Sequence, residues 1–290
     1  MNITAEMVKN LRESTGAGMM DCKKALVETN GDMDKAVDYL REKGISKAAK
    51  KADRIAAEGL SNIYISGNNA VVVEINSETD FVAKNEEFKS LVDIIGNAIL
   101  NGTANSLEEA LKITVDGETI ESLIVNATAK IGEKLSLRRF EKVIKEDNQT
   151  FGAYLHMGGK ISSLIVLSGD NEAVAKDVAM QSAAMKPLYV SREDVSKEEI
   201  EHEKSVLTSQ VVEEGKKPEF AEKIVEGRLN KFFEEICLIE QPFVKDSGLT
   251  VKEYLNQNNS EVVKMIRYEV GEGMEKRNDN FAEEVMNQIK

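Results

Sequence analysis

The first 43 residues carry hydrophobic positions three or four residues apart, the spacing of amphipathic helices. Three hydrophobic stripes are separated by breaks at residues 15–18 and at Asn30-Gly31. They are formed by Ile3, Met7, Val8 and Leu11, by Met19, Cys22 and Leu26, and by Met33, Ala36, Val37 and Leu40. The pattern predicts three short helices, with Asp32 as N-cap of the third and Gly44 as its end. A unit this small buries little, so most of its surface should face solvent or a partner.

Beyond a basic, alanine-rich stretch at residues 45–58, which we expect to be a helical connector, the pattern changes to a period of two. Apolar residues alternate on both sides of a Gly67-Asn68-Asn69 turn, which is typical of a β-hairpin. A helical stripe follows, formed by Phe88, Leu91, Val92, Ile95 and Ile99.

The hairpin and the start of its helix occur a second time along the chain. Gly67 corresponds to Gly159, and Val82-Ala83-Lys84 corresponds to Val174-Ala175-Lys176. A third strand also repeats, since Arg139-Phe140-Glu141 resembles Arg267-Tyr268-Glu269. The second copy of this strand comes much later, so we infer two related α+β subdomains, the second one interrupted.

The segment that interrupts the second subdomain predicts two helices, one on either side of Gly215-Lys216-Lys217-Pro218. A glycine followed by a proline is typical of a place where one helix ends and another begins. The second helix carries hydrophobic residues spaced four, three and four apart, which is coiled-coil spacing. They are Val225, Leu229, Phe232 and Ile236. We therefore expect an antiparallel helical hairpin.

Together these patterns predict an α+β protein with a three-helix N-terminal domain, a core of two subdomains, a coiled-coil insertion and a C-terminal helix. The expected bounds are 1–53 for the N-terminal domain with its connector, 54–146 for the first core subdomain, 147–190 and 236–272 for the second, 191–235 for the insertion and 273–290 for the C-terminal module.

The repeat provides an internal control for one aromatic residue. Phe81, in the stretch after the strand of the first copy, corresponds to Ala173 in the second copy, although the flanking Val-Ala-Lys is present in both. If the fold alone required an aromatic side chain there, the second copy should supply one. Two interpretations stay open: Phe81 packs under its own helix, or it faces a partner from a strand-to-helix loop.

The net charge of −13 argues against nucleic acid as a ligand, because phosphate binding requires clustered lysines and arginines. Residues 47–54 are a local basic exception, which we interpret as solvated. Cys22 and Cys237 form no CxxC pair, and His156 and His202 belong to no His/Cys cluster, so we expect neither a metal site nor a cofactor. Without a signal peptide or an apolar run of roughly 18 residues, we expect a cytoplasmic protein with no membrane segment.

Motifs of the common catalytic classes are missing. The sequence contains no G-x-x-x-x-G-K-[ST], G-x-G-x-x-G or G-x-S-x-G. Gly158-Gly159-Lys160 fits a hairpin turn better than a phosphate-binding loop. We therefore expect a protein that is not an enzyme.

Two segments resemble the signatures of the elongation factor Ts family. One is LRESTGAGMMDCKKAL, from Leu11 to Leu26, and the other is EINSETDFVAK, from Glu74 to Lys84. The resemblance extends over the whole chain, including the helical hairpin. The three expected N-terminal helices are also similar to ubiquitin-associated modules.

This resemblance implies a nucleotide-exchange factor whose partner is elongation factor Tu with GDP bound. It implies that Asp80 and Phe81, flanked by Thr79 and Val82, enter a cleft of the GTPase domain and disturb the groups that hold Mg²⁺ near the phosphates. GDP, GTP and Mg²⁺ would all be carried by the partner.

The resemblance places further contacts outside this segment. Arg12, Met19 and Met20 should touch the GTPase domain near the nucleotide, and His156 should touch it elsewhere. Val244 should lie against another domain of the partner. We expect Met19 and Met20 to divide their roles, one facing the core and at least one exposed.

Other functions remain possible at this stage. The three-helix unit alone fits a ubiquitin-like-binding adaptor, and the helical hairpin alone fits a scaffold without exchange activity. An enzyme of unknown type is a further alternative. The hairpin could also support self-association.

Overall fold

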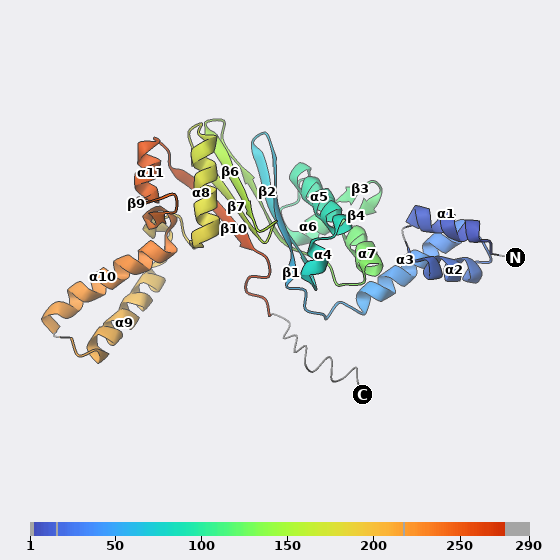
Figure 1. Cartoon of the computed structure of the whole chain (residues 1–290), viewed down its shortest axis with the longest axis horizontal. Coiled ribbons are helices and arrows are strands. Elements are labelled where there is room, and N and C mark those ends of the chain that lie inside the picture. The colour runs from blue at the N-terminus through green and yellow to red at the C-terminus, as the bar shows by residue number, and fades with distance from the viewer. Residues whose placement is uncertain (1–2, 16, 217, 276–290) are drawn as a thin grey trace. The chain divides into compact units, whose positions relative to one another are not determined.

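The computed structural model describes residues 3–15, 17–216 and 218–275. It mixes helices with β-sheet, as the sequence predicts for an α+β protein (Figure 1). The chain falls into two compact units. Unit 1 contains the chain up to Tyr64, Val73–Lys142 and the segment from Glu269 onward, and unit 2 contains Ile65–Val72 and Val143–Tyr268. The finer division into five domains stays a prediction.

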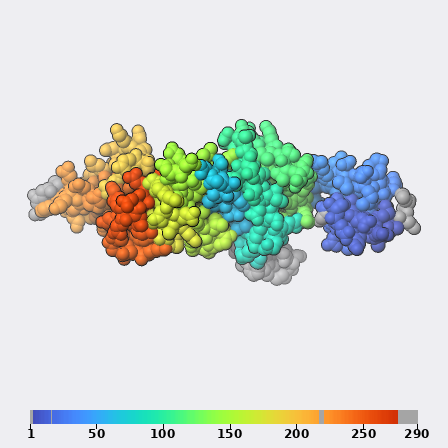
Figure 2. All heavy atoms as spheres, turned by 90° about the horizontal axis from the view of Figure 1, so that it is seen from above, coloured from blue at the N-terminus to red at the C-terminus, as the bar shows by residue number. Residues whose placement is uncertain are grey.

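Helices α1 (Ala5–Thr15), α2 (Met19–Glu28) and α3 (Met33–Ala49) pack into a small bundle, drawn in blue in Figures 1 and 2. Asp32 caps α3 by accepting a hydrogen bond from the Lys35 backbone N–H at 3.1 Å. The buried core of the bundle consists of Val8, Leu11, Cys22, Ala25, Leu26 and Ala36.

The predicted end of the third helix at Gly44 is wrong, because α3 continues to Ala49. A Cβ atom on Gly44 would lie 3.5 Å from the Ala129 side chain of α7 (Ile120–Ile131). This is an ordinary van der Waals distance, so Gly44 lies where α3 packs against α7 and does not terminate the helix. A tertiary contact of this kind leaves no local signal in the sequence.

The first sheet has the strand order β1-β2-β5, formed by β1 (Glu58–Ser66), β2 (Asn69–Ser77) and β5 (Ser136–Ile144). The turn between β1 and β2 contains Gly67, with a φ of 55°. Helix α5 (Glu86–Asn101) buries the predicted stripe and lies against β1, since a Cβ on Gly96 would come within 2.0 Å of the Tyr64 ring. The smaller elements of this region are α4 (Asp80–Ala83), α6 (Leu107–Leu111), β3 (Thr114–Val115) and β4 (Glu118–Thr119).

The second sheet has the order β10-β7-β6, formed by β6 (Gln149–His156), β7 (Ile161–Ser168) and β10 (Val262–Glu269). Strands β6 and β7 are antiparallel, in register from Gln149↔Ser168 to His156↔Ile161. Helix α8 (Glu172–Met185) follows β7. Each sheet thus contains a hairpin whose second strand lies in the middle, next to a strand that comes later in the chain.

Between α8 and β10 the chain forms a pair of long helices, α9 (Lys197–Glu213) and α10 (Pro218–Ile236), which lie side by side (Figure 1). Leu207, Val211 and Val225 are the buried residues between them. The remaining elements are the 3₁₀ turns η1 (Arg192–Asp194) and η2 (Leu238–Glu240), β8 (Pro242–Phe243), β9 (Asp246–Thr250) and α11 (Val251–Gln257). Most of the predicted C-terminal helix, from residue 276 onward, lies outside the described residues.

Candidate functional site

Phe81 lies on the surface at the carboxyl end of the middle strand of the first sheet. We call residues 77–83 the Phe81 loop. The Phe81 side chain is 78% exposed, whereas those of Val82 and Ala83 are buried. Phe81 therefore does not pack beneath its own helix, and the two residues that follow it anchor the one-turn helix α4 to the core. Because Val82 is buried, it supports the loop and offers little surface to a partner.

The polar residues of the Phe81 loop make hydrogen bonds and ion pairs within unit 1. Asp80 and Lys84 form an ion pair of 2.7 Å, and the Lys84 ammonium lies 5.8 Å from the centre of the Phe81 ring. Thr79 is half-buried and donates both its backbone N–H and its hydroxyl to Glu133, at 2.9 and 2.6 Å. The loop thus presents one exposed aromatic ring beside two charged groups.

Arg12, Met19 and Met20 all lie on exposed positions of the three-helix bundle. Met19 is 58% exposed and Met20 is 73% exposed, so the expected division, with one of them in the core, is wrong. Met19 is the first residue of α2, and the buried part of this helix begins one turn later, at Cys22. The hydrophobic stripe predicted for this helix therefore includes one residue, Met19, that lies outside the core.

His156 and Val244 belong to unit 2. His156 is exposed at the end of β6, where its ring stacks on Tyr154 with the ring centres 6.1 Å apart. Val244 is exposed in the turn between β8 and β9, and its backbone N–H donates to the amide oxygen of the buried Gln181 at 2.8 Å. The structure thus places Thr79 to Val82 on one loop and Arg12, Met19 and Met20 on the three-helix bundle, whereas His156 and Val244 lie on different elements of unit 2.

A buried carboxylate in unit 1 was not predicted from the sequence. Glu74, on β2, is completely buried and pairs with Arg138 at 2.8 Å and Arg139 at 2.6 Å. It also accepts the backbone N–H of Gly271 at 2.9 Å. Burial alone would raise the pKa of Glu74, but the Gly271 hydrogen bond and the two guanidinium groups hold this pKa below its usual value. The signal that could have revealed it is a charged residue between Val73 and Ile75, inside the otherwise apolar run of residues 70–75.

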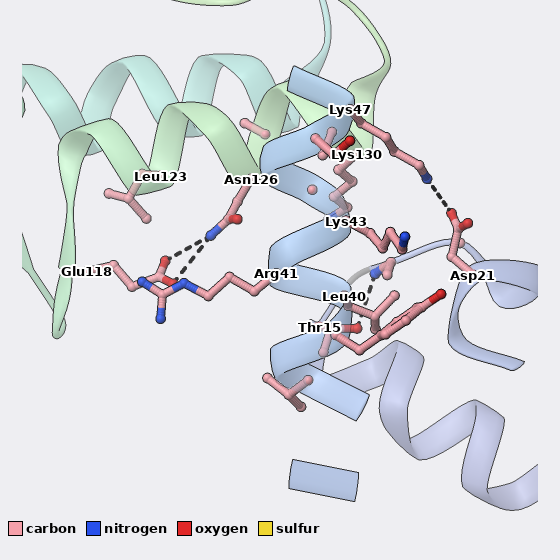
Figure 3. Close-up of a pocket in the computed structure, with 18 of the residues that line it drawn as sticks. Thr15, Asp21, Leu40, Arg41, Lys43, Lys47, Glu118, Leu123, Asn126 and Lys130 are labelled. Carbon is pink, nitrogen blue, oxygen red and sulfur yellow. Dashed lines mark hydrogen bonds and ion pairs between the residues drawn. The ribbon is translucent and has the colours of Figure 1, made fainter. Parts of the chain in front are cut away.

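A groove of about 930 Å³ in unit 1 lies beside α2, α3, α5 and α7 (Figure 3). Two ion pairs lie in its lining: Lys47 contacts Asp21 at 2.8 Å, and Lys130 contacts Glu87 at 2.6 Å. Nothing in this lining selects a ligand. Within the described part of the chain, no cluster of three or more His, Cys, Asp or Glu side chains is placed to hold a metal ion, and no helix is long and apolar enough to cross a membrane.

Comparison with known protein families identifies the family of this chain. The model of the family "Elongation factor TS" matches residues 78–272, which is more than half of the chain. The chain belongs to the elongation factor Ts family. The match begins within the Phe81 loop and ends at Glu272, so it contains both the second sheet and the α9–α10 pair. The three-helix bundle with Arg12, Met19 and Met20 lies outside it.

Membership indicates an elongation factor Ts-type function. The family consists of nucleotide-exchange factors and not of enzymes that make or break covalent bonds, and it implies an interaction with elongation factor Tu.

Proposed function

We propose that this protein binds elongation factor Tu in its GDP-bound form and promotes GDP release, after which GTP rebinds. The observation that carries the proposal is the exposure of Phe81 on a loop whose neighbouring residues are buried or hydrogen-bonded. A large aromatic side chain that a hydrogen-bonded loop holds in solvent adds little to the packing of this chain. Its energetic value lies in a pocket of another protein.

Linkage defines what such a contact must do. If binding of this protein weakens GDP binding to the partner, GDP must weaken binding of this protein by the same factor. The Phe81 contact can produce this effect only if it prefers the form of the partner from which Mg²⁺ and GDP are lost. Asp80 would place a carboxylate and its hydrogen-bonding capacity near the Mg²⁺ and phosphate groups.

The other predicted contact residues would supply binding energy that offsets the interactions the partner gives up when GDP leaves. Arg12, Met19 and Met20 would bind the GTPase domain, as would His156 at another place, and Val244 would bind a second domain. The protein itself would need no cofactor and perform no covalent step. Its place of action would be the cytoplasm.

The test is release of a fluorescent GDP analogue from purified elongation factor Tu. We expect strong acceleration by the wild-type protein and about a 30-fold smaller effect of Phe81→Ala, because truncating a central aromatic contact costs about 2 kcal/mol or more. Phe220→Ala is the matched control, since Phe220 on α10 is 55% exposed and undergoes the same chemical change. No acceleration by the wild-type protein at any concentration would overturn the proposal.

A further inference from the structure

The Phe81 loop is hydrogen-bonded to a second loop, residues 133–134, and each loop contributes two consecutive residues to these bonds. Thr79 donates its N–H and hydroxyl to the carboxylate of Glu133, at 2.9 and 2.6 Å. In return, the backbone N–H of Lys134 donates to the carboxylate of Glu78 at 2.6 Å. The bonds run in opposite directions between neighbouring residues, so the two loops are fixed at two points. Glu133 and Lys134 follow α7, more than fifty residues away in sequence.

A third segment strengthens this arrangement. The Arg54 guanidinium approaches both carboxylate oxygens of Glu78 at 3.3 Å, and the Lys134 ammonium donates to the Arg54 carbonyl at 3.0 Å. Glu78 and Glu133 thus each receive more than one donor. Hydrogen bonds to carboxylates are stronger than those between neutral groups.

The internal repeat shows that this device is not required by the fold. Asn171, which occupies the position of Thr79 in the second copy, caps its own helix α8 by accepting the Val174 N–H at 3.2 Å. Thr79 precedes α4 in the same way but makes no such cap bond. Its side chain is used instead for the bond to Glu133. The copy that carries Phe81 thus has the Thr79–Glu133 bonds, whereas the copy that carries Ala173 has a helix cap at the same position.

We propose that Glu133 is a positioning residue that holds Thr79 and thereby fixes the direction in which Phe81 leaves the surface. The inference rests on the proposed function, because it assigns Glu133 a role in exchange. The physical reason is preorganisation: a loop already held in its binding conformation loses less conformational freedom when it binds. Without the Glu133 bonds, the Phe81 loop keeps its attachment through Glu78 but loses the one at Thr79, so Thr79 and Phe81 must lose more conformational freedom when the partner is engaged.

Three variants separate this role from general stability. Glu133→Ala removes both bonds from Thr79, and Thr79→Val removes only the hydroxyl bond. Glu133→Gln can keep both, because its amide oxygen can accept the Thr79 N–H while its NH₂ donates to the hydroxyl oxygen. Glu118→Ala is the matched control, since Glu118 is also half-buried in unit 1 and accepts from Asn126 at 3.3 and 3.4 Å, far along the sequence from the Phe81 loop.

The experiment measures acceleration of GDP release by these variants, alone and combined with Phe81→Ala. We expect Glu133→Ala to lower the acceleration about 5- to 30-fold, the range that corresponds to one or two kcal/mol. Thr79→Val should show a smaller loss, and Glu133→Gln and Glu118→Ala should stay within about twofold of wild type. In the Phe81→Ala background, Glu133→Ala should cause almost no further loss, because it acts through Phe81.

Amide hydrogen exchange gives an independent measure of the loop. Glu133→Ala should speed exchange at residues 79–83 and leave α5 protected as in wild type. Wild-type-like acceleration by Glu133→Ala, or an equal loss with and without Phe81, would overturn the positioning role alone. If Glu133→Ala fails to fold, Thr79→Val is tested in its place, alone and combined with Phe81→Ala. The positioning role then requires that Thr79→Val lowers the acceleration of GDP release in the wild-type background and causes no further loss in the Phe81→Ala background. Failure of the wild-type protein to accelerate release would instead overturn the proposed function.

Discussion

At the scale of single residues, Glu133 and Glu74 are examples of glutamates that hold distant segments in place. Glu133 fixes Thr79, and Glu74 joins the β5 arginines to the segment around Gly271. Neither contact could be predicted from the sequence, because both partners lie tens of residues away and hydrophobic periodicity says nothing about them. The exposed Phe81 could be suspected, because the repeat supplies a comparison within the same chain.

Glu74 also leads to a prediction about stability and pH. Glu74→Gln leaves Arg138 and Arg139 without their buried anion, so we expect a loss of about 3–5 kcal/mol in the free energy of unfolding. Since folding lowers the pKa of Glu74, its contribution is present above the pKa of the unfolded chain and lost as pH falls through the folded-state pKa. Urea unfolding between pH 7 and pH 3 should therefore show a weaker acid dependence in Glu74→Gln. An identical acid dependence in both proteins would contradict this account.

At the scale of elements, periodic hydrophobic spacing predicts the three N-terminal helices, both hairpins, α5 and the α9–α10 pair. It fails where a tertiary contact decides the outcome. Gly44 lies inside a helix that packs on α7, and Met19 is exposed because the bundle core begins one turn later. Element type is a property of the local chain, whereas element ends and exposure depend on neighbours.

Gly152 tests how closely α8 packs on β6. A Cβ at this position would lie 2.0 Å from the Ala175 carbonyl oxygen, so the helix backbone itself would have to shift. We expect Gly152→Ala to lower the free energy of unfolding by about 1–3 kcal/mol. Gly227→Ala is the control, because nothing lies within 4 Å of its added Cβ on α10, and it should be neutral or stabilising by up to about 1 kcal/mol. Equal urea midpoints for the two variants would refute the close approach.

At the scale of the whole molecule, we expect the α9–α10 pair to be separable from the proposed exchange function. Its stem is closed by hydrogen bonds, since Leu188 and Tyr189 both donate their N–H to the Ile236 carbonyl, at 2.8 and 3.0 Å. We expect a chain in which a short Gly-Asn turn replaces residues 205–227 to fold and to keep accelerating GDP release. If the protein were instead a scaffold that acts through the α9–α10 pair, the shortened chain would lose all partner binding. Co-sedimentation of the shortened chain with elongation factor Tu distinguishes these two outcomes. Comparing the masses of both chains in solution also tests self-association.

The most direct test of the account measures coupling between the two ligands of elongation factor Tu. The dissociation constant of this protein is determined for the nucleotide-free and the GDP-bound partner, with the wild-type chain and with Phe81→Ala. We predict that GDP weakens wild-type binding strongly and that Phe81→Ala reduces the ratio of the two constants by about tenfold or more, mainly by weakening binding to the nucleotide-free form. An unchanged ratio, with both constants raised equally, would show that Phe81 only adds affinity and would contradict its role in displacing GDP.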